Sequence, residues 1–180
     1  PYMHTPENDP SQPRPALIFI PDISGFTRFV TDTEISHARH IIQELLNLLL
    51  DANQLGLEVS EVEGDAILFY RFGKPPLAKE LLEQVKSMFT GFHHHLQRYE
   101  SHRICNCGAC RTAHSLSIKF VAHYGDVSMN QVRQFTKLFG KEVIVAHRLL
   151  KNDIDTHEYV LLTEELTRTY PDWVLGKNQS

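Results

Sequence analysis

Two stretches of the sequence decide the fold: residues 16–27, ALIFIPDISGFT, and residues 57–72, LEVSEVEGDAILFYRF. The first begins with an apolar, β-prone run, which predicts a buried strand that ends at Pro21. In the second, two β-prone runs flank the polar triplet Glu63-Gly64-Asp65, which predicts two strands joined by a tight hairpin. Together they predict a sheet in which the first strand lies beside a hairpin.

Acidic residues stand at both strand ends. Asp22 follows the first strand, and a tight hairpin brings Asp65 close to it. Two carboxylates on neighbouring strands can hold two divalent cations roughly 3.5–4 Å apart, which suits an in-line phosphoryl displacement. The residues after Asp22 include Gly25 and begin a helix, where backbone N–H groups can cradle phosphate. Each pattern alone is weakly specific, because Asp and Gly also favour ordinary turns.

The rest of the chain alternates helices and strands. Apolar spacing predicts helices at residues 33–51, 77–99 and 143–150, and strands at 115–124 and 159–162. Gly125-Asp126 predicts a turn, and residues 127–138 are expected to form one or two short extended pieces. The order β-α-β-β-α-β predicts an α+β, ferredoxin-like antiparallel sheet with helices on one face.

Composition sets the domain boundaries and excludes several classes of protein. Proline-rich residues 1–15 predict an extended or disordered arm, residues 16–170 one folded domain, and residues 171–180 a tail. With 42% hydrophobic and 22% charged residues, the chain is neither largely disordered nor collagen-like. No apolar run approaches the ~20 residues of a membrane span. A net charge of -4 disfavours a nucleic-acid partner but not a nucleotide.

Three cysteines lie within six residues, in an insert at residues 102–114. An odd, clustered set is a poor disulfide framework and fits a reducing compartment, so the expected location is cytoplasmic. Thiolates at Cys105, Cys107 and Cys110 favour Zn²⁺, with His102, His114 or a group from a partner chain as fourth ligand. The alternative is a set of reduced thiols in a mobile loop.

Several blocks in the same order resemble the class III nucleotide cyclase catalytic domain. These are Asp-Ile-Ser-Gly-Phe-Thr at 22–27, Glu-x-x-Gly-Asp-Ala at 61–66, His-x-Gly at 123–125, and Phe139-Gly140 followed by Arg148. The resemblance covers roughly residues 16–163. The Cys-x-Cys-x-x-Cys insert and the segment 145–152 are similar to a bacterial branch of cyclase-like proteins, the DUF2652 family.

The resemblance implies a role for each matching position. Asp22 and Asp65 match the two aspartates that bind two Mg²⁺ or Mn²⁺ ions, and Arg148 matches the arginine that stabilises charge on the α-phosphate. Glu61 matches the base-reading position and favours GTP, since a carboxylate can accept hydrogen bonds from guanine. A homodimer is implied, with Arg148 and Lys137 reaching across to the partner. The segment whose backbone receives the triphosphate contains Ile23, Gly25, Phe26 and Thr27.

Two positions depart from the pattern of the cyclases. The transition-state asparagine is replaced by Ile144, which cannot donate a hydrogen bond, and the second base-reading position is Lys137. The chain also ends soon after Trp173, where the family usually adds a hairpin that can carry a phosphate-binding lysine. The expected function is binding of a purine nucleoside triphosphate, with weak or no formation of a 3′,5′-cyclic nucleotide and pyrophosphate. The alternative is a catalytically silent nucleotide-sensing or dimerisation module.

Overall fold

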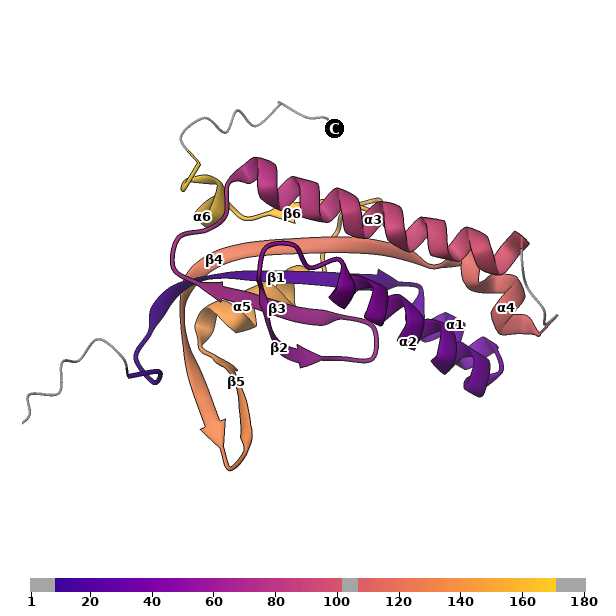
Figure 1. Cartoon of the computed structure of the whole chain (residues 1–180), viewed down its shortest axis with the longest axis horizontal. Helices are drawn as coiled ribbons and strands as arrows, with labels where there is room; N and C mark the ends of the chain where they lie inside the picture. The colour runs from indigo at the N-terminus through magenta and orange to yellow at the C-terminus, as the bar shows by residue number, and fades with distance from the viewer. Residues whose placement is uncertain (1–8, 102–106, 171–180) are drawn as a thin grey trace, which may run out of the picture.

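The computed structural model describes residues 9–101 and 107–170 (Figure 1). A sheet of β2, β3, β1, β4 and β5 in that spatial order has antiparallel neighbours throughout, and β6 pairs in parallel with β4. This confirms the predicted α+β, ferredoxin-like class. The strands are β1 (Arg14–Ser24), β2 (Glu58–Val62), β3 (Ile67–Phe72), β4 (Ser117–Val132), β5 (Phe135–Phe139) and β6 (Val160–Leu162). The helices are α1 (Phe26–Asp32), α2 (Ile35–Asp51), α3 (Ala78–Ser101), α4 (Gly108–Thr112), the 3₁₀ helix η2 (Ala113–Ser115), α5 (Lys141–Leu149) and α6 (Glu164–Thr167).

Strand β1 is the centre of the sheet and is buried on both faces from Ala16 to Ile23. Burial on both faces explains why its sequence is a continuous apolar run instead of an alternating pattern. It begins two residues earlier than predicted, because Arg14 and Pro15 pair with β4 and so do not belong to the predicted arm. Residues 1–8 of that arm and the predicted tail lie outside the described residues.

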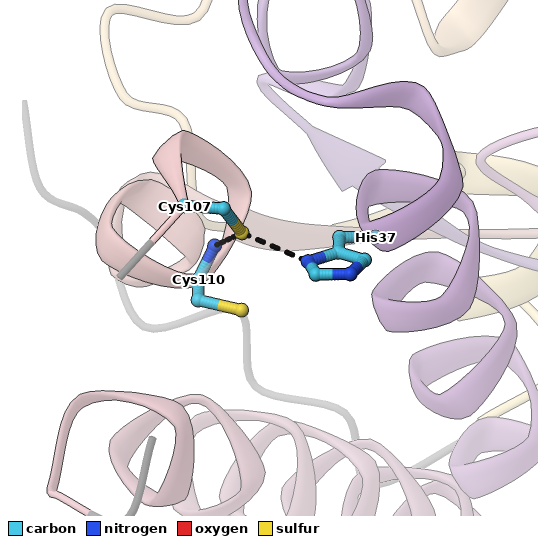
Figure 2. Close-up of side chains that lie close together, drawn as sticks. All are labelled: His37, Cys107 and Cys110. Carbon is cyan, nitrogen blue, oxygen red and sulfur yellow. Dashed lines mark hydrogen bonds between the residues drawn. The ribbon is translucent and has the colours of Figure 1, made fainter. Parts of the chain in front are cut away.

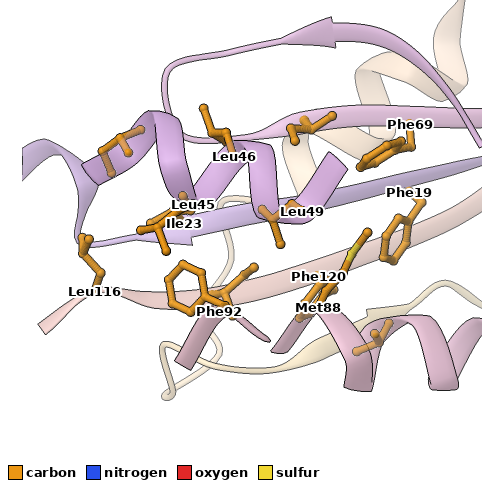
Figure 3. Packing of buried hydrophobic residues seen from close by; sticks show 14 of the residues in the cluster. Phe19, Ile23, Leu45, Leu46, Leu49, Phe69, Met88, Phe92, Leu116 and Phe120 are labelled. Atoms are coloured by element: carbon orange, nitrogen blue, oxygen red, sulfur yellow. The ribbon is translucent and has the colours of Figure 1, made fainter. Parts of the chain in front are cut away.

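The two long helices pack on one face of the sheet, as predicted. Leu45 and Leu49 of α2 and Phe92 of α3 meet Phe19 of β1 and Phe120 of β4 in the main core (Figure 3). All five side chains are at most 1% exposed. The helices form there because apolar residues recur every three to four positions, which gives each helix one apolar side.

The short helix α5 packs over the opposite face, so the prediction of helices on one face holds for α2 and α3 but not for α5. Ala146 of α5 is fully buried against a second apolar cluster that contains Ala16, Ile18 and Ile20, the β1 residues that alternate with those of the main core. Asp22 continues this alternation, because side chains two residues apart along a strand point to the same face. Its carboxyl is thereby placed on the side of the sheet that α5 covers.

The predicted turn at Gly125-Asp126 is wrong, because β4 runs through both residues to Val132. Gly125 pairs with Ala16 within the sheet. A Cβ at Gly125 would lie 2.7 Å from Cγ of Glu142 at the start of α5. The glycine therefore permits close approach of α5 to the strand instead of reversing the chain.

The second half of β4 and the whole of β5 form a hairpin that extends away from the body of the molecule (Figure 1). Three apolar side chains of this hairpin are largely exposed: Val132 at 61%, Phe135 at 69% and Phe139 at 61%. This agrees with the extended pieces predicted at residues 127–138. Within the described part of the chain, every helix is too short or too polar to cross a membrane.

Candidate functional site

The structure brings Asp22 and Asp65 to neighbouring strand ends, as the hairpin predicted. Asp22 pairs with Ala66, and the backbone N–H of Ile23 donates a 2.7 Å hydrogen bond to the carbonyl oxygen of Asp65. Both aspartates line one cavity of about 620 Å³ between the sheet and α5. Asp22 is only 8% exposed, so its carboxyl is close to the cavity floor.

The two carboxyl groups have unfavourable surroundings when ionised. Burial, the largest cause, and the nearby charge of Asp65 together raise the pKa of Asp22 to about 6, while Lys119 acts in the opposite direction. Burial also raises the pKa of Asp65, and Lys119 again opposes the rise. Desolvation and a like charge both disfavour a carboxylate. A bound cation would therefore offset the cost of ionising these two carboxyl groups.

Lys119 is a site residue that the sequence analysis missed. Its Nζ lies 3.4 Å from Oδ2 of Asp22 and donates a 2.7 Å hydrogen bond to the carbonyl oxygen of Leu150. The β1–β4 register places Lys119 directly opposite Asp22. The signal for Lys119 in the sequence is a lysine within an otherwise apolar predicted strand. Only the pairing of the two strands identifies its partner.

One side of α5 forms a wall of the same cavity. Ile144, His147, Arg148 and Lys151 line it, with the spacing of residues on one face of a helix. Arg148 therefore shares a cavity with Asp22 and Asp65 of its own chain. Ile144 is 54% exposed. The residue at the asparagine position thus faces the cavity without a hydrogen-bonding group.

Glu61 contacts α5 and is not among the residues that line the cavity. Its Oε1 lies 3.4 Å from Nε2 of His147, and Oε1 of Glu63 lies 3.8 Å from Nδ1 of the same imidazole. The ligand atoms of these three residues all lie within 4.8 Å of one another. The predicted base-reading carboxylate is therefore engaged by a histidine of its own chain.

The predicted phosphate segment is only partly next to the aspartates. Gly25, at a φ of +86°, lines a separate cavity of about 590 Å³, and the N–H of Ile23 is already bonded to Asp65. Phe26 packs against the main core, and Thr27 is exposed at the start of α1. The first N–H groups of a helix have no partner within it. In this segment, the N–H groups at the start of α1 are therefore the ones that could contact a phosphate.

Lys137 lies apart from the cavity of its own chain. It is exposed on β5, paired with Asn130 across the extended hairpin, and is not among the residues that line the cavity. Its predicted reach into a partner's site stays a prediction.

The predicted zinc ligands are also only partly described. His102 and Cys105 lie outside the described residues. Cys107 and Cys110 lie close together at the start of α4, while His114 lines the second cavity and is not in their group. The histidine that joins the two thiols is His37 of α2, which the sequence analysis did not consider.

Comparison with known proteins places this chain in a family. Residues 42–159 match the family described as "Protein of unknown function (DUF2652)". The Mycobacterium tuberculosis (strain ATCC 25618 / H37Rv) protein described as "Uncharacterized protein Rv2561/Rv2562" is 32% identical over 121 residues, or 67% of this chain. The chain spans 56% of the length of that relative.

Solved structures show the fold. The adenylyl cyclase CyaB from P. aeruginosa superposes with a TM-score of 0.59 at 18% identity, over 88% of this chain and 81% of that one. A class III adenylyl cyclase-like ATP-binding protein from Pseudomonas aeruginosa gives a TM-score of 0.61 at 13% identity, over 89% of this chain and 35% of that one. The chain therefore belongs to the DUF2652 family and has the fold of class III cyclase catalytic domains.

Proposed function

We propose that this domain binds a purine nucleoside triphosphate together with two divalent cations, and that it forms cyclic nucleotide slowly or not at all. The observation that carries the proposal is the cavity itself. It joins Asp22 and Asp65, on neighbouring strand ends, to the cationic side chains Lys119 and Arg148. Carboxylates suit hard cations, and cationic side chains beside them suit phosphate.

The residues present fit the cations that the cyclase resemblance implies. Asp22 and Asp65 supply oxygen donors, which Mg²⁺ and Mn²⁺ prefer. Burial raises the pKa values of both groups, so a bound cation would compensate for the desolvation of their charged forms. When bound, divalent cations would neutralise phosphate charge and lower the pKa of the ribose 3′-hydroxyl. The ammonium of Lys119, 3.4 Å from Asp22, must withdraw to admit a cation.

The remaining cavity residues suit the phosphates. Arg148 can form paired hydrogen bonds to phosphate oxygens, and Lys119 and Lys151 add point charges along the same walls. Lys119 also offers a phosphate-binding lysine from within the sheet. In the family a C-terminal hairpin can carry such a residue. Because these groups belong to β4 and α5, they are held by the packing of the two elements.

Cyclisation would make a bond from the ribose 3′-oxygen to the α-phosphorus and break the bond from that phosphorus to pyrophosphate, with loss of the 3′-hydroxyl proton. Fast cyclisation requires groups that bind the transition state more tightly than the ground state. Arg148 can do so through charge. Ile144 occupies a cavity position where a donor would help, and the loss of one preorganised donor costs roughly 10²–10³ in rate.

The base preference is proposed to be guanine. The carboxylate of Glu61 can accept hydrogen bonds from guanine N1–H and N2–H, but it must first exchange its contact with His147. Adenine presents no matching pair of donors to a carboxylate.

A homodimer would complete the site in this proposal. The exposed apolar side chains of Phe135, Phe139 and Ile144 are suited to contact a second copy. Arg148 lines its own chain's cavity, so its action within or across chains requires a direct test. Mixing Asp22→Asn with Arg148→Ala chains restores a working site only if the arginine acts across the dimer. Binding that stays absent in the mixture would assign the arginine to its own chain.

The second candidate is a silent module that binds nucleotide as a signal. Ile144 favours it, and one protein of this fold is itself described as cyclase-like and ATP-binding. Calorimetry with each of the four NTPs and Mn²⁺, followed by mass spectrometry of the same samples, separates the candidates. We expect GTP to bind best and cyclic product to be scarce. Fast cyclisation would show an efficient enzyme, and absence of any binding would reject both.

A further inference from the structure

The first turn of α2 and the start of α4 form a second cluster, which shares no residue with the lining of the aspartate cavity. It contains His37, Cys107 and Cys110, whose ligand atoms all lie within 4.8 Å of one another (Figure 2). Nδ1 of His37 lies 3.0 Å from Sγ of Cys107. We propose that these three side chains bind a zinc ion, and that His37 is its imidazole ligand.

The donor set points to zinc among biological metals. Two thiolates and an imidazole are soft to borderline ligands, which favour Zn²⁺ over Mg²⁺ or Ca²⁺. Zinc–sulfur bonds of about 2.3 Å and zinc–nitrogen bonds of about 2.0–2.1 Å place tetrahedral ligand atoms roughly 3.5–4 Å apart. The ligand atoms of the cluster all lie within 4.8 Å of one another, and the histidine–cysteine pair, at 3.0 Å, must open by roughly half an ångström. Among the residues that the structure describes, these three side chains supply three of the four ligands of a tetrahedron.

A second contact holds the cluster together independently of any metal. Glu34, one turn before His37, accepts a 3.1 Å hydrogen bond from the N–H of Ala109, between the two cysteines. Hydrogen bonds from the N–H groups of Glu34 itself, Gly108 and Ala109 lower the pKa of the Glu34 carboxyl. A Cβ on Gly108 would lie 3.2 Å from Oε2 of Glu34, so glycine lets the carboxylate approach. The first turn of α2 therefore presents Glu34 and His37 to the same loop.

The local backbone also suits a metal-bound thiolate. The N–H of Cys110 donates to Sγ of Cys107 at 3.4 Å, a bond that favours the charged form of the sulfur. The neighbouring Arg111 adds a positive charge on the same helix. The spacing Cys-x-x-Cys across a turn brings two sulfurs to one ion.

A zinc ion bound to this cluster would have a structural role. It would join the start of α2 to α4, and α2 follows directly on α1 and the Gly25 turn. The ion would fix the orientation of the segment that the nucleotide proposal places near phosphate, yet it would lie outside the aspartate cavity. Failure of nucleotide binding therefore leaves the zinc proposal intact, and failure of zinc binding leaves the nucleotide proposal intact.

The test measures Zn²⁺ binding to the full chain and to matched histidine variants. We expect about one zinc per chain after purification without added metal, and an affinity loss of about 100-fold or more in His37→Ala, because a direct ligand exceeds the 10–100-fold of an outer contact. His114→Ala and His40→Ala are the controls. His114 was the histidine expected from sequence, and His40 is an exposed histidine of the same helix. Both should bind zinc like the unaltered chain.

Two outcomes would overturn the proposal. One is a His37→Ala chain with unaltered zinc affinity, and the other is a loss in His114→Ala that His37→Ala does not share. If His37→Ala fails to fold, X-ray absorption of zinc in the unaltered chain decides, because a ligand set without imidazole nitrogen rejects the assignment. Cobalt substitution gives a further check, since thiolate-to-cobalt absorption should weaken in Cys107→Ser and in Cys110→Ser.

Discussion

The aspartate cavity and the cysteine–histidine cluster differ in how the fold prepares them for a cation. In the cavity, burial raises the pKa values of two carboxyl groups, the charge of Asp65 adds to the rise at Asp22, and Lys119 partly compensates at both. In the cluster, exposed His37 contacts Cys107 directly, and the ligands come from a helix end and a short loop. A cation in the cavity would relieve a cost of folding. A cation in the cluster would join two segments.

The largest expected effect is a reciprocal loss at the two sites. Asp22→Asn should weaken Mn²⁺-dependent nucleotide binding by about 100-fold or more, because it removes a charged ligand from a desolvated site, and should leave zinc content unchanged. Cys107→Ser should lower the zinc content and leave nucleotide binding unchanged. Calorimetry and elemental analysis of the same preparations measure both, with Asp155→Asn, an exposed carboxyl, as the control. Loss of both ligands in either variant would contradict the independence of the sites.

The next effect concerns chemistry in the cavity. Ile144→Asn should raise cyclic product formation by roughly 10- to 100-fold, because it supplies an amide donor at a position where isoleucine has none. Stability should change little, since Ile144 is 54% exposed. Ile154→Asn, at a residue 42% exposed outside the cavity, is the matched control. Turnover is read by mass spectrometry, and an unchanged rate would show that the missing donor is not what limits it.

A smaller effect separates the two roles of Lys119. Lys119→Met should raise the affinity for Mn²⁺ alone by about 3-fold, since a competing charge leaves, and lower triphosphate affinity by about 10-fold. Lys79→Met changes an exposed lysine of α3 and should alter neither. Titrations of Mn²⁺ with and without GTP measure the two affinities. Equal changes in both would mean that Lys119 does not contact phosphate.

The smallest effect is on stability without metal. The folded-state pKa of Asp22, about 6, lies above its ordinary value of 3.8, so ionisation disfavours folding. The penalty is absent below pH 3.8, grows as pH rises to about 6, and is complete above that. Asp22→Asn should therefore stabilise the metal-free protein at pH 8 by about 1 kcal/mol, after allowance for the lost Lys119 ion pair. Urea unfolding at pH 8 and pH 4 measures it, and the gain should vanish at pH 4.

The sequence predicted those parts of the site that are determined by residues adjacent in the chain. The strand of Asp22 and the hairpin of Asp65 are each encoded by adjacent residues, so their meeting followed from hairpin geometry. Lys119 and His37 could not be found in this way. Their partners depend on strand register and on helix docking across 97 and 70 positions.

Two glycines show how one residue type was predicted rightly at one place and wrongly at another. Gly64 lies in the hairpin as expected, with a Cβ position 3.1 Å from the Phe26 ring. Gly125 was predicted to turn the chain, yet it lies within β4. There the absence of a side chain allows Glu142 of α5 to approach closely. Local sequence does not distinguish a glycine needed for a turn from one needed for a neighbouring element.

Pro21 lies where the pairing between β1 and β3 is interrupted, next to Asp22 of the aspartate cavity. It has no N–H, and the β1–β3 register runs from Ala16 to Phe19 and returns only at Asp22. The two carboxyl-bearing ends can therefore separate slightly without breaking the ladder behind them. Hydrogen exchange should report this as earlier labelling of the Ile23 amide than of the Phe19 amide. Mn²⁺ should slow it selectively, as a cation fixes the spacing between the two strand ends.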